Sequence, residues 1–479
     1  MYGVIDIGTT GIKLSVYDEE LKKVHQEKVI VGFEHLEGGF VEQSSVRILE
    51  IVKGLVRRSR DLGVRKIGIC TYRASVLAWK DSGEPLTNVI TWIDGRGREI
   101  TSKLPKGVRF LMRLSKSLRT VLSPDSPAVL LKWIYETIGI YKEVEDGKAF
   151  AWTLDSFLLY NLTGKFVSDP TNATLTGLIH PKDLREIELV FDLLKLPRVI
   201  PDVVDNVHEF GRVDDMDLSV SIADQQSATV GMGVLERGRV ESTHGTGSFL
   251  EAVTSGFLMP KGGLIPVVIL SVDGRRTYGL EGFIRSTGST VDWLKEVGLF
   301  ESYDEMERLA EEGKKGPVLV PSLGGLKVPG AQHLRGCIAG LSLSTGRADV
   351  LSGVAWGISL HLALILELLR SHLGSLREPL LAAGGYSKSN VFLRRLADLS
   401  GMRVARPKDV EASSSGVAKL LAYSDGELNL EDLKELPDLE EEFEPAMEEE
   451  VRRNLIQEYS KLLEVLVKWE ENPFLKGAF

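Results

Sequence analysis

The chain has 479 residues, of which 43% are hydrophobic and 26% are charged, so it is long enough for two or more domains of a soluble globular protein. Its formal net charge of −10 argues against a nucleic-acid-binding protein, because phosphate backbones are bound by basic surfaces. The two cysteines, Cys70 and Cys337, lie far apart in the sequence, which argues against a disulfide framework or a structural zinc site and suits a reducing cytoplasm.

The first predicted element is a β-hairpin in the segment "VIDIGTTGIKLSVYD", with "GTTG" as its turn. A plain hairpin turn accounts for the glycines. A second interpretation is that Thr9 and Thr10 add hydroxyl donors to a turn whose backbone N–H groups approach a phosphate. Asp6 could then hold a hydrated Mg²⁺, and Lys13 adds a positive charge beyond the turn.

Alternating strand and helix patterns follow the hairpin. The segment "SVRILEIVKGLVRRSRDLG" has helical spacing and precedes the strand pattern "VRKIGIC", which indicates an α/β fold. Residues 101–150 are predicted to be mostly helical, with one helix beginning at Ser126 and Pro127. A further helix, "TLDSFLLYNLTG", ends at Gly164.

Asp224 ends the apolar strand "SVSIAD" and precedes a helix of small residues. Ligands bind at strand ends in α/β folds, so Asp224 is a candidate general base that takes a proton from a hydroxyl during phosphoryl transfer. The alternative is that Asp224 simply caps the helix that follows, and both roles can hold together.

A second hairpin opens the other half of the chain after a domain boundary that we place near residue 235. Its turn, "STHGTGS", contains Gly245 and Thr246 and repeats the composition of the first turn. Two such turns suggest a duplicated architecture facing a shared cleft, although each alone is also explained as a simple hairpin turn.

Three later segments complete the second half. The apolar stretch over residues 353–370 contains His361 and Glu367, and we expect a buried helix rather than a membrane span. In "LLAAGGYSKSN", a strand meets a helix that begins near Asn390, a geometry that suits a flat base or a phosphate as well as a plain tight turn. The acid-rich end of the chain predicts a solvated face on an amphipathic helix.

The ordered series "DIGTTGIKLSVYD", "GGFVEQ", "WIDGRG", "SDPTNAT", "IADQQSA", "HGTGS", "LEGFIRSTGSTVDWL" and "AAGGYSKSNVFLRRLADLSGMRV" resembles the FGGY carbohydrate kinases, over nearly the whole chain. The resemblance implies an α/β fold of two actin-like (ribonuclease H-like) ATPase domains with an interdomain cleft. The domains implied are an N-terminal substrate-binding domain over residues 1–235, an ATP-binding domain over residues 236–430, and an acidic loop and C-terminal helix over residues 431–479.

The resemblance also implies a set of site residues. It makes Asp224 the catalytic base and places Asp6 near Mg²⁺. The residues that it implies for the carbohydrate substrate are Arg73, Trp92, Asp125 and Gln225. The residues that it implies for ATP are Thr9, Thr10, Lys13, Gly245, Thr246, Gly288, Asp292, Gly385 and Asn390. It implies a cytoplasmic enzyme without a nucleic-acid or membrane partner, and it allows a homodimer or a homotetramer.

Departures from the family pattern bear on the substrate. Glycerol kinases usually have Gln-Arg-Glu where this chain has Tyr72, Arg73 and Ala74, so a carboxylate that would accept hydrogen bonds from polyol hydroxyls is missing. Asp125 replaces a tyrosine. Ala74 leaves room for a larger sugar or sugar acid. A non-catalytic sugar-binding regulator and an actin-like ATPase remain the alternative functions.

Overall fold

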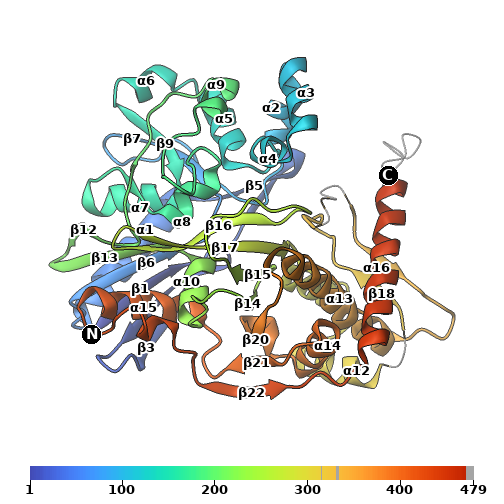
Figure 1. Ribbon diagram of the computed structural model, residues 1–479. Coiled ribbons are helices and arrows are strands. Elements are labelled where there is room, and N and C mark those ends of the chain that lie inside the picture. The colour runs from blue at the N-terminus through green and yellow to red at the C-terminus, as the bar shows by residue number, and fades with distance from the viewer. Residues whose placement is uncertain (314–315, 329, 331–333, 471–479) are drawn as a thin grey trace. The chain divides into compact units, whose positions relative to one another are not determined.

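The computed structural model describes residues 1–313, 316–328, 330 and 334–470, apart from the side chain of residue 116. These residues form two compact units, which are described separately (Figure 1). The first unit contains residues 1–231, 267–277 and 413–433, and the second contains residues 232–266, 278–412 and 434–479.

The first unit is built on a six-stranded sheet in the order β12-β13-β6-β1-β2-β3. The first three strands of the chain are antiparallel neighbours, whereas β6 and β13 run parallel to β1. The strands of this sheet are β1 (Tyr2–Ile7), β2 (Gly11–Tyr17), β3 (Lys23–Ile30), β6 (Lys66–Thr71), β12 (Val207–Val213) and β13 (Met216–Ala223). The predicted first hairpin and the strand before Asp224 are therefore both present.

A second, five-stranded sheet of this unit has the order β4-β5-β8-β7-β9. Its strands are β4 (Glu34–Leu36), β5 (Phe40–Gln43), β7 (Val76–Lys80), β8 (Val89–Ile90) and β9 (Ala149–Thr153), and β10 (Val167–Ser168) pairs with β11 (Asp202–Val203). The helices are α1 (Ser45–Asp61), α2 (Gly97–Lys103), α3 (Lys106–Leu114), α4 (Lys116–Val121), α5 (Pro127–Ile138), α6 (Tyr141–Glu145), α7 (Leu154–Thr163), α8 (Pro170–Ala173), α9 (Glu188–Leu194), α10 (Asp224–Gly231) and α15 (Ala412–Ser424).

The second unit repeats the strand arrangement. In its seven-stranded sheet, β16-β17-β15-β14-β20-β21-β22, the series β17-β15-β14 is antiparallel and β20 and β21 run parallel to β14. This is the same order of three antiparallel and two parallel strands as β3-β2-β1-β6-β13. Because both units share it, the predicted α/β fold of two actin-like domains is confirmed.

The strands of this sheet and of the two-stranded sheet β18-β19 are β14 (Arg239–His244), β15 (Ser248–Val253), β16 (Ile265–Val272), β17 (Arg275–Ile284), β18 (Val318–Val320), β19 (Cys337–Ala339), β20 (Arg377–Ala383), β21 (Val404–Pro407) and β22 (Leu439–Phe443). Residues 267–277, which include most of β16 and the start of β17, are part of the first unit. The helices of the second unit are α11 (Gly288–Glu296), α12 (Tyr303–Glu312), α13 (Arg347–Leu373), α14 (Asn390–Ser400) and α16 (Glu449–Glu470).

Helix α13 is the only helix among the described residues that is long and apolar enough to cross a membrane. Because 78% of its most apolar stretch is buried inside the protein, it is a core helix, as its sequence predicted. It packs against both α12 and α14 and contacts β15 of the sheet.

The two units differ from the predicted domain ranges in the placement of residues 267–277 and of α15, which lie with the first unit rather than the second. Small residues allow α15 to pack closely against α10 of the first unit. A Cβ atom added to Gly416 would lie 1.8 Å from the carbonyl oxygen of Ser227 in α10, and the Ser227 hydroxyl donates to the Ser413 carbonyl at 2.7 Å. The close approach of α15 to α10 depends on the "SSSG" sequence, whose packing partner lies nearly two hundred residues earlier.

Candidate active site

Two carboxylates lie at one edge of the sheet in the first unit. The register of β1, β6 and β13 aligns Ile7, Thr71 and Ala223, so Asp6 precedes this level by one residue and Asp224 follows it by one. Between them lies the buried thiol of Cys70, whose pKa is raised by burial and by the negative charges of both carboxylates. The edge where parallel strands end is the usual binding edge of an α/β sheet.

Asp224 is the first residue of α10. Its Oδ1 accepts the backbone N–H of the next residue, Gln225, at 2.8 Å, which is nearer in the chain than the N–H that a helix-capping side chain usually accepts. The same oxygen lies 3.9 Å from Nε of Arg73, and the Asp224 side chain keeps 22% of its surface exposed. The carboxylate is therefore held in place and still accessible, which a general base requires.

Asp6 is almost fully buried beside a cation and a hydroxyl. Lys13 is its cross-strand neighbour, with 3.9 Å between Nζ and Oδ2, and Ser414 of α15 donates to Oδ2 at 3.5 Å. The turn between them closes through a 3.1 Å hydrogen bond from Gly8 N–H to the Gly11 carbonyl, and it leaves Thr10 exposed. The predicted residues Asp6, Thr9, Thr10 and Lys13 are thus brought together.

A buried Gln–Tyr pair supports this turn and was not predicted. Gln43 donates through Nε2 to the Thr9 carbonyl at 2.8 Å, and its Oε1 accepts the Tyr72 hydroxyl at 2.6 Å. Both side chains are buried. The only sequence signal was that Gln43 ends the family-like motif "GGFVEQ" and that Tyr72 precedes Arg73, which does not reveal that they meet.

Three of the predicted substrate residues lie on loops of the first unit, and the fourth, Gln225, is the second residue of α10. Arg73 follows β6 and is buried, and Ala74 after it has a φ of 56°, which is uncommon for a residue with a Cβ atom. The Ser75 hydroxyl accepts the Trp92 N–H at 3.1 Å and so ties the Trp92 loop to this turn. Gln225 has a buried Oε1 with no hydrogen-bond partner among the residues that the structure describes.

Arg96 organises the loop that contains Trp92. It donates to both carboxylate oxygens of Asp94 at 2.9 Å and lies 2.7 Å from Glu42. Its guanidinium is 4.5 Å from the ring centroids of both Phe40 and Trp133. The motifs "GGFVEQ" and "WIDGRG" therefore meet through one buried cation.

Asp125 lies on a loop that packs directly against Gly97. A Cβ atom on Gly97 would lie 2.0 Å from the Pro124 carbonyl oxygen, so only glycine fits there. Asp125 is half-buried. The position of this predicted substrate residue thus depends on a glycine at the start of α2.

We expect Gly97→Ala to displace the Asp125 loop, raise KM for the carbohydrate at least fivefold, and lower stability by about 1–3 kcal/mol through overpacking. Steady-state kinetics and urea unfolding measure the two effects. Gly95→Ala is the matched control, because a Cβ atom there would have its nearest neighbour at 3.5 Å, an ordinary contact. Equal KM values for both variants would contradict the prediction.

In the second unit, the predicted residues Gly245, Thr246 and Gly288 come together. Gly288 and Ser289 at the start of α11 donate their N–H groups to the carbonyls of Gly245 and Thr246 at 3.1 and 3.3 Å. A Cβ atom on Gly288 would lie 2.4 Å from the Gly245 carbonyl oxygen. The close approach therefore requires glycine and joins the β14–β15 turn to a helix N-terminus.

The other predicted nucleotide residues have different surroundings. Asp292 is an exposed residue of α11 that accepts the Tyr303 hydroxyl at 2.7 Å. Asn390 accepts a 2.7 Å hydrogen bond from Arg406. A Cβ atom on Gly385 would meet nothing within 4 Å, whereas one on Gly384 would lie 2.5 Å from the His244 carbonyl oxygen. The glycine required for packing beside the turn is therefore Gly384, which the sequence pattern placed after the strand together with Gly385 but which was not among the residues implied for ATP.

His244, next to Gly245, is a structural residue. It is fully buried, and its ring nitrogens lie 2.8 and 2.9 Å from the hydroxyls of Ser248 and Ser242. Burial lowers the pKa of His244 to about 3, so the imidazole is neutral at physiological pH. It fixes the turn without adding charge.

A buried pair of carboxyl groups, Asp155 and Asp169, lies in the first unit. Burial, and then the nearby charge of Asp169, raise the pKa of Asp155 to about 7 from an ordinary value of 3.8. Asp169 caps α8 and receives more hydrogen bonds, so Asp155 is the member that holds the proton near neutral pH.

This pair predicts a pH dependence of stability. Because the folded state binds the Asp155 proton more tightly than the unfolded state, the contribution of Asp155 is favourable below pH 4 and is lost as the pH rises through 7. We expect Asp155→Asn to be more stable relative to the original protein at pH 8 than at pH 5. Urea unfolding of both proteins at the two pH values measures this, and an unchanged difference would contradict it.

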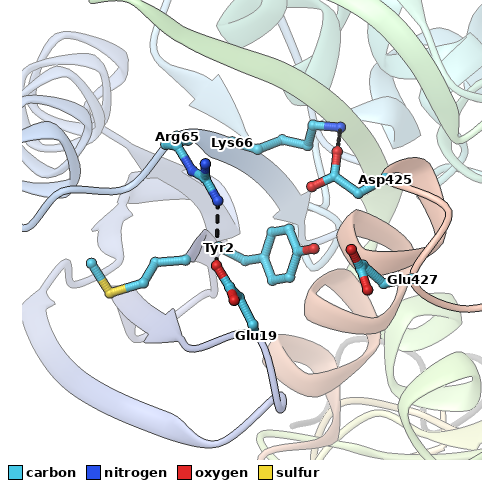
Figure 2. A pocket seen from close by; sticks show the side chains of 7 residues that line it. Tyr2, Glu19, Arg65, Lys66, Asp425 and Glu427 are labelled. Carbon is cyan, nitrogen blue, oxygen red and sulfur yellow. Dashed lines mark hydrogen bonds and ion pairs between the residues drawn. The ribbon is translucent and has the colours of Figure 1, made fainter.

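A surface pocket lies at the opposite edge of the same sheet, lined by Met1, Tyr2, Glu19, Arg65, Lys66, Asp425 and Glu427 (Figure 2). Arg65 pairs with Glu19 at 3.3 Å, and Lys66 pairs with Asp425. Tyr2 is level with Lys66 and four residues before Asp6, which is about 13 Å along a strand. This pocket is therefore separate from the two carboxylates.

Comparison with known proteins gives a consistent result. A family model described as the N-terminal domain of the FGGY family of carbohydrate kinases matches residues 1–221, and the model of the C-terminal domain matches residues 240–424. A glycerol kinase of Thermus brockianus is 31% identical over 487 residues, which cover 97% of this chain and 98% of that protein. An uncharacterized sugar kinase of Archaeoglobus fulgidus is 29% identical, covering 87% of this chain and 90% of that protein.

Solved structures share the fold. Plasmodium falciparum glycerol kinase with ADP superposes with a TM-score of 0.85 at 25% identity, covering 97% of this chain and 98% of that chain. A xylulose kinase from Lactobacillus acidophilus gives a TM-score of 0.83 at 18% identity with the same coverage.

Proposed function

The chain belongs to the FGGY family of carbohydrate kinases, and from this premise we propose that Asp224 is the general base that accepts the proton of the substrate hydroxyl while ATP donates its γ-phosphoryl group. The observation that carries the proposal is the position of Asp224 and Asp6 at one edge of one sheet, with β6 between them. One carboxylate lies at the start of a helix and the other lies beside a lysine and a hairpin turn.

Residues of the first unit have separate roles in the proposed reaction. Asp224 removes the proton as the new oxygen–phosphorus bond forms, and Arg73, 3.9 Å away, limits the orientations of the carboxylate. Lys13 neutralises charge on the transferred phosphoryl group, and the exposed residue Thr10 of the turn adds a hydroxyl donor. Most of the rate enhancement comes from positioning and charge neutralisation, because phosphoryl transfer requires little covalent chemistry from the protein.

Binding of ATP is assigned to residues of both units. Thr9, Thr10 and Lys13 belong to the first, and Gly245, Thr246, Gly288, Asp292, Gly385 and Asn390 belong to the second. Asp6 fits the magnesium ion, because Mg²⁺ prefers one or two carboxylates completed by water and phosphate oxygens. Among the residues that the structure describes, no group of three or more metal-ligating side chains competes for that role. When bound, Mg²⁺ would supply charge neutralisation at the phosphates.

The substrate is proposed to be larger than glycerol, a sugar or a sugar acid. Tyr72 is not available as a substitute for a polyol-binding glutamine, because its hydroxyl is buried and donates to Gln43. Ala74 has no polar side chain, so this position offers space rather than a hydrogen-bond acceptor. Arg73, Trp92, Asp125 and Gln225 are the proposed contacts. The reaction is placed in the cytoplasm, where ATP is abundant.

An ADP-release assay over polyols, ketoses, aldonates and uronates tests the proposal, with glycerol in the panel and a reaction without acceptor as the control. We expect ADP release that depends on a sugar or sugar acid. Release that is independent of any acceptor would support an actin-like ATPase instead. A ligand-induced thermal shift without turnover would indicate a sugar-binding regulator.

A further inference from the structure

Asp169 is a fully buried carboxylate that gathers an unusual number of hydrogen bonds. Its two oxygens accept six donors, which come from the backbone and side chain of Thr171, the backbone and side chain of Asn172, and the side chains of Asn206 and Ser221. A buried charge is stabilised only by such pairing. These donors belong to three segments that are far apart in the sequence, so Asp169 holds them together.

One of these bonds, and one further bond made by Thr171, reach the strand that ends at the base. Ser221 donates to Asp169 at 3.0 Å. Thr171 donates its hydroxyl to Asp169 and accepts the backbone N–H of Ala223 at 2.8 Å. The anchored positions are three residues and one residue before Asp224. The hydroxyl of Thr171 is therefore a direct link between the buried carboxylate and the peptide unit next to the base.

Asn206 links Asp169 to the same strand through a separate pair of hydrogen bonds. Its side-chain amide donates to Asp169 at 3.2 Å and to the Ser221 carbonyl at 2.9 Å. Its Oδ1 accepts the Ser271 N–H at 2.8 Å. Because Ser221 and Ala223 are both anchored, the end of β13 has little freedom to shift along its axis.

We propose that Asp169 and Thr171 are positioning residues that hold the backbone before Asp224 so that its carboxylate meets the substrate hydroxyl. This inference rests on the proposed function, since it assigns no contact with substrate. Its physical basis is that a general base works only within hydrogen-bond reach of its proton, and a shift of about 1 Å can cost about a hundredfold in rate.

The test compares two buried threonines that make similar bonds. Thr176 donates to the Ala173 carbonyl at 2.6 Å and accepts the Leu178 N–H at 3.0 Å, but it has no bond to β13. Thr171→Val and Thr176→Val each remove one threonine hydroxyl, and both sites are fully buried. We expect Thr171→Val to lower kcat 10- to 100-fold with KM for ATP changed less than twofold. We expect Thr176→Val to keep kcat within twofold, and Thr171→Ser to restore most of the lost kcat.

Several outcomes would overturn the proposal: more than half of the original kcat in Thr171→Val, an equal loss of kcat in Thr176→Val, or no recovery in Thr171→Ser. Should Thr171→Val not fold, Asp169→Asn provides a second measurement, with kcat expected to fall at least tenfold and normal kcat contradicting the proposal. Absence of acceptor-dependent turnover in the original protein would instead contradict the proposed function, so the two failures are distinguishable.

Discussion

Replacing Asp224 with asparagine is expected to lower kcat by at least a hundredfold while leaving the affinity for ATP nearly unchanged. General bases contribute roughly 10²–10⁴-fold to rate, and the asparagine amide cannot accept the proton. The fold should persist, because asparagine Oδ1 can still accept the Gln225 N–H that Asp224 Oδ1 accepts at 2.8 Å. Coupled ADP release measures turnover and calorimetric titration measures ATP binding.

Asp217→Asn is the matched control for this experiment. Asp217 lies on the same strand, β13, but it is exposed and pairs with Arg212 at 3.3 Å. Its substitution makes the same chemical change about seven residues from the base and should leave kcat within twofold. Retention of more than half of the original activity by Asp224→Asn would remove Asp224 from the mechanism.

The second large effect is expected from Arg96→Met, which should lower the unfolding free energy of the first unit by about 3–5 kcal/mol. Arg96 is 2% exposed and neutralises the buried carboxylate of Asp94 and the partly buried carboxylate of Glu42. Methionine can occupy the space between Phe40 and Trp133, so the loss would come mainly from uncompensated buried charge. KM for the carbohydrate should also rise, because the same cluster orders the Trp92 loop.

Two further variants separate charge from geometry. Arg96→Lys keeps the positive charge but loses the planar fork that reaches Asp94 with two hydrogen bonds, so its unfolding free energy should lie between those of the original protein and Arg96→Met. Arg98→Met alters an exposed residue of α2, two positions after Arg96, and should change stability by less than about 0.5 kcal/mol. Equal unfolding curves for Arg96→Met and Arg98→Met, measured in urea, would contradict this account of the cluster.

Local patterns predicted the parts of the site that a short segment specifies. Alternation, turn chemistry and residue size predict three of these parts. They are the hairpin turn before Lys13, the strand that ends at Asp224 and the glycines of the second turn. These features need only neighbours within about ten residues. The resemblance to a family then related segments that the patterns alone could not connect.

Contacts between distant segments were not predictable in the same way. Gln43 meets Tyr72, Arg96 meets Glu42, and Thr171 meets Ala223 only because strand order and loop packing bring them together. Each of these residues is unremarkable in its own segment, and a buried polar group gives no sequence signal of its partner. The contribution of each residue to stability depends on the hydrogen bonds that it completes.

The sequence by itself determined the secondary structure around the site and the identity of the carboxylates, because both depend on local backbone preferences and on the chemistry of single side chains. Only the tertiary structure decided which carboxylates share an edge and which residues hold them there. Alignment of β1, β6 and β13 is a property of the whole sheet, and it is the register of those strands that brings Asp6 and Asp224, 218 positions apart in the chain, to the same place.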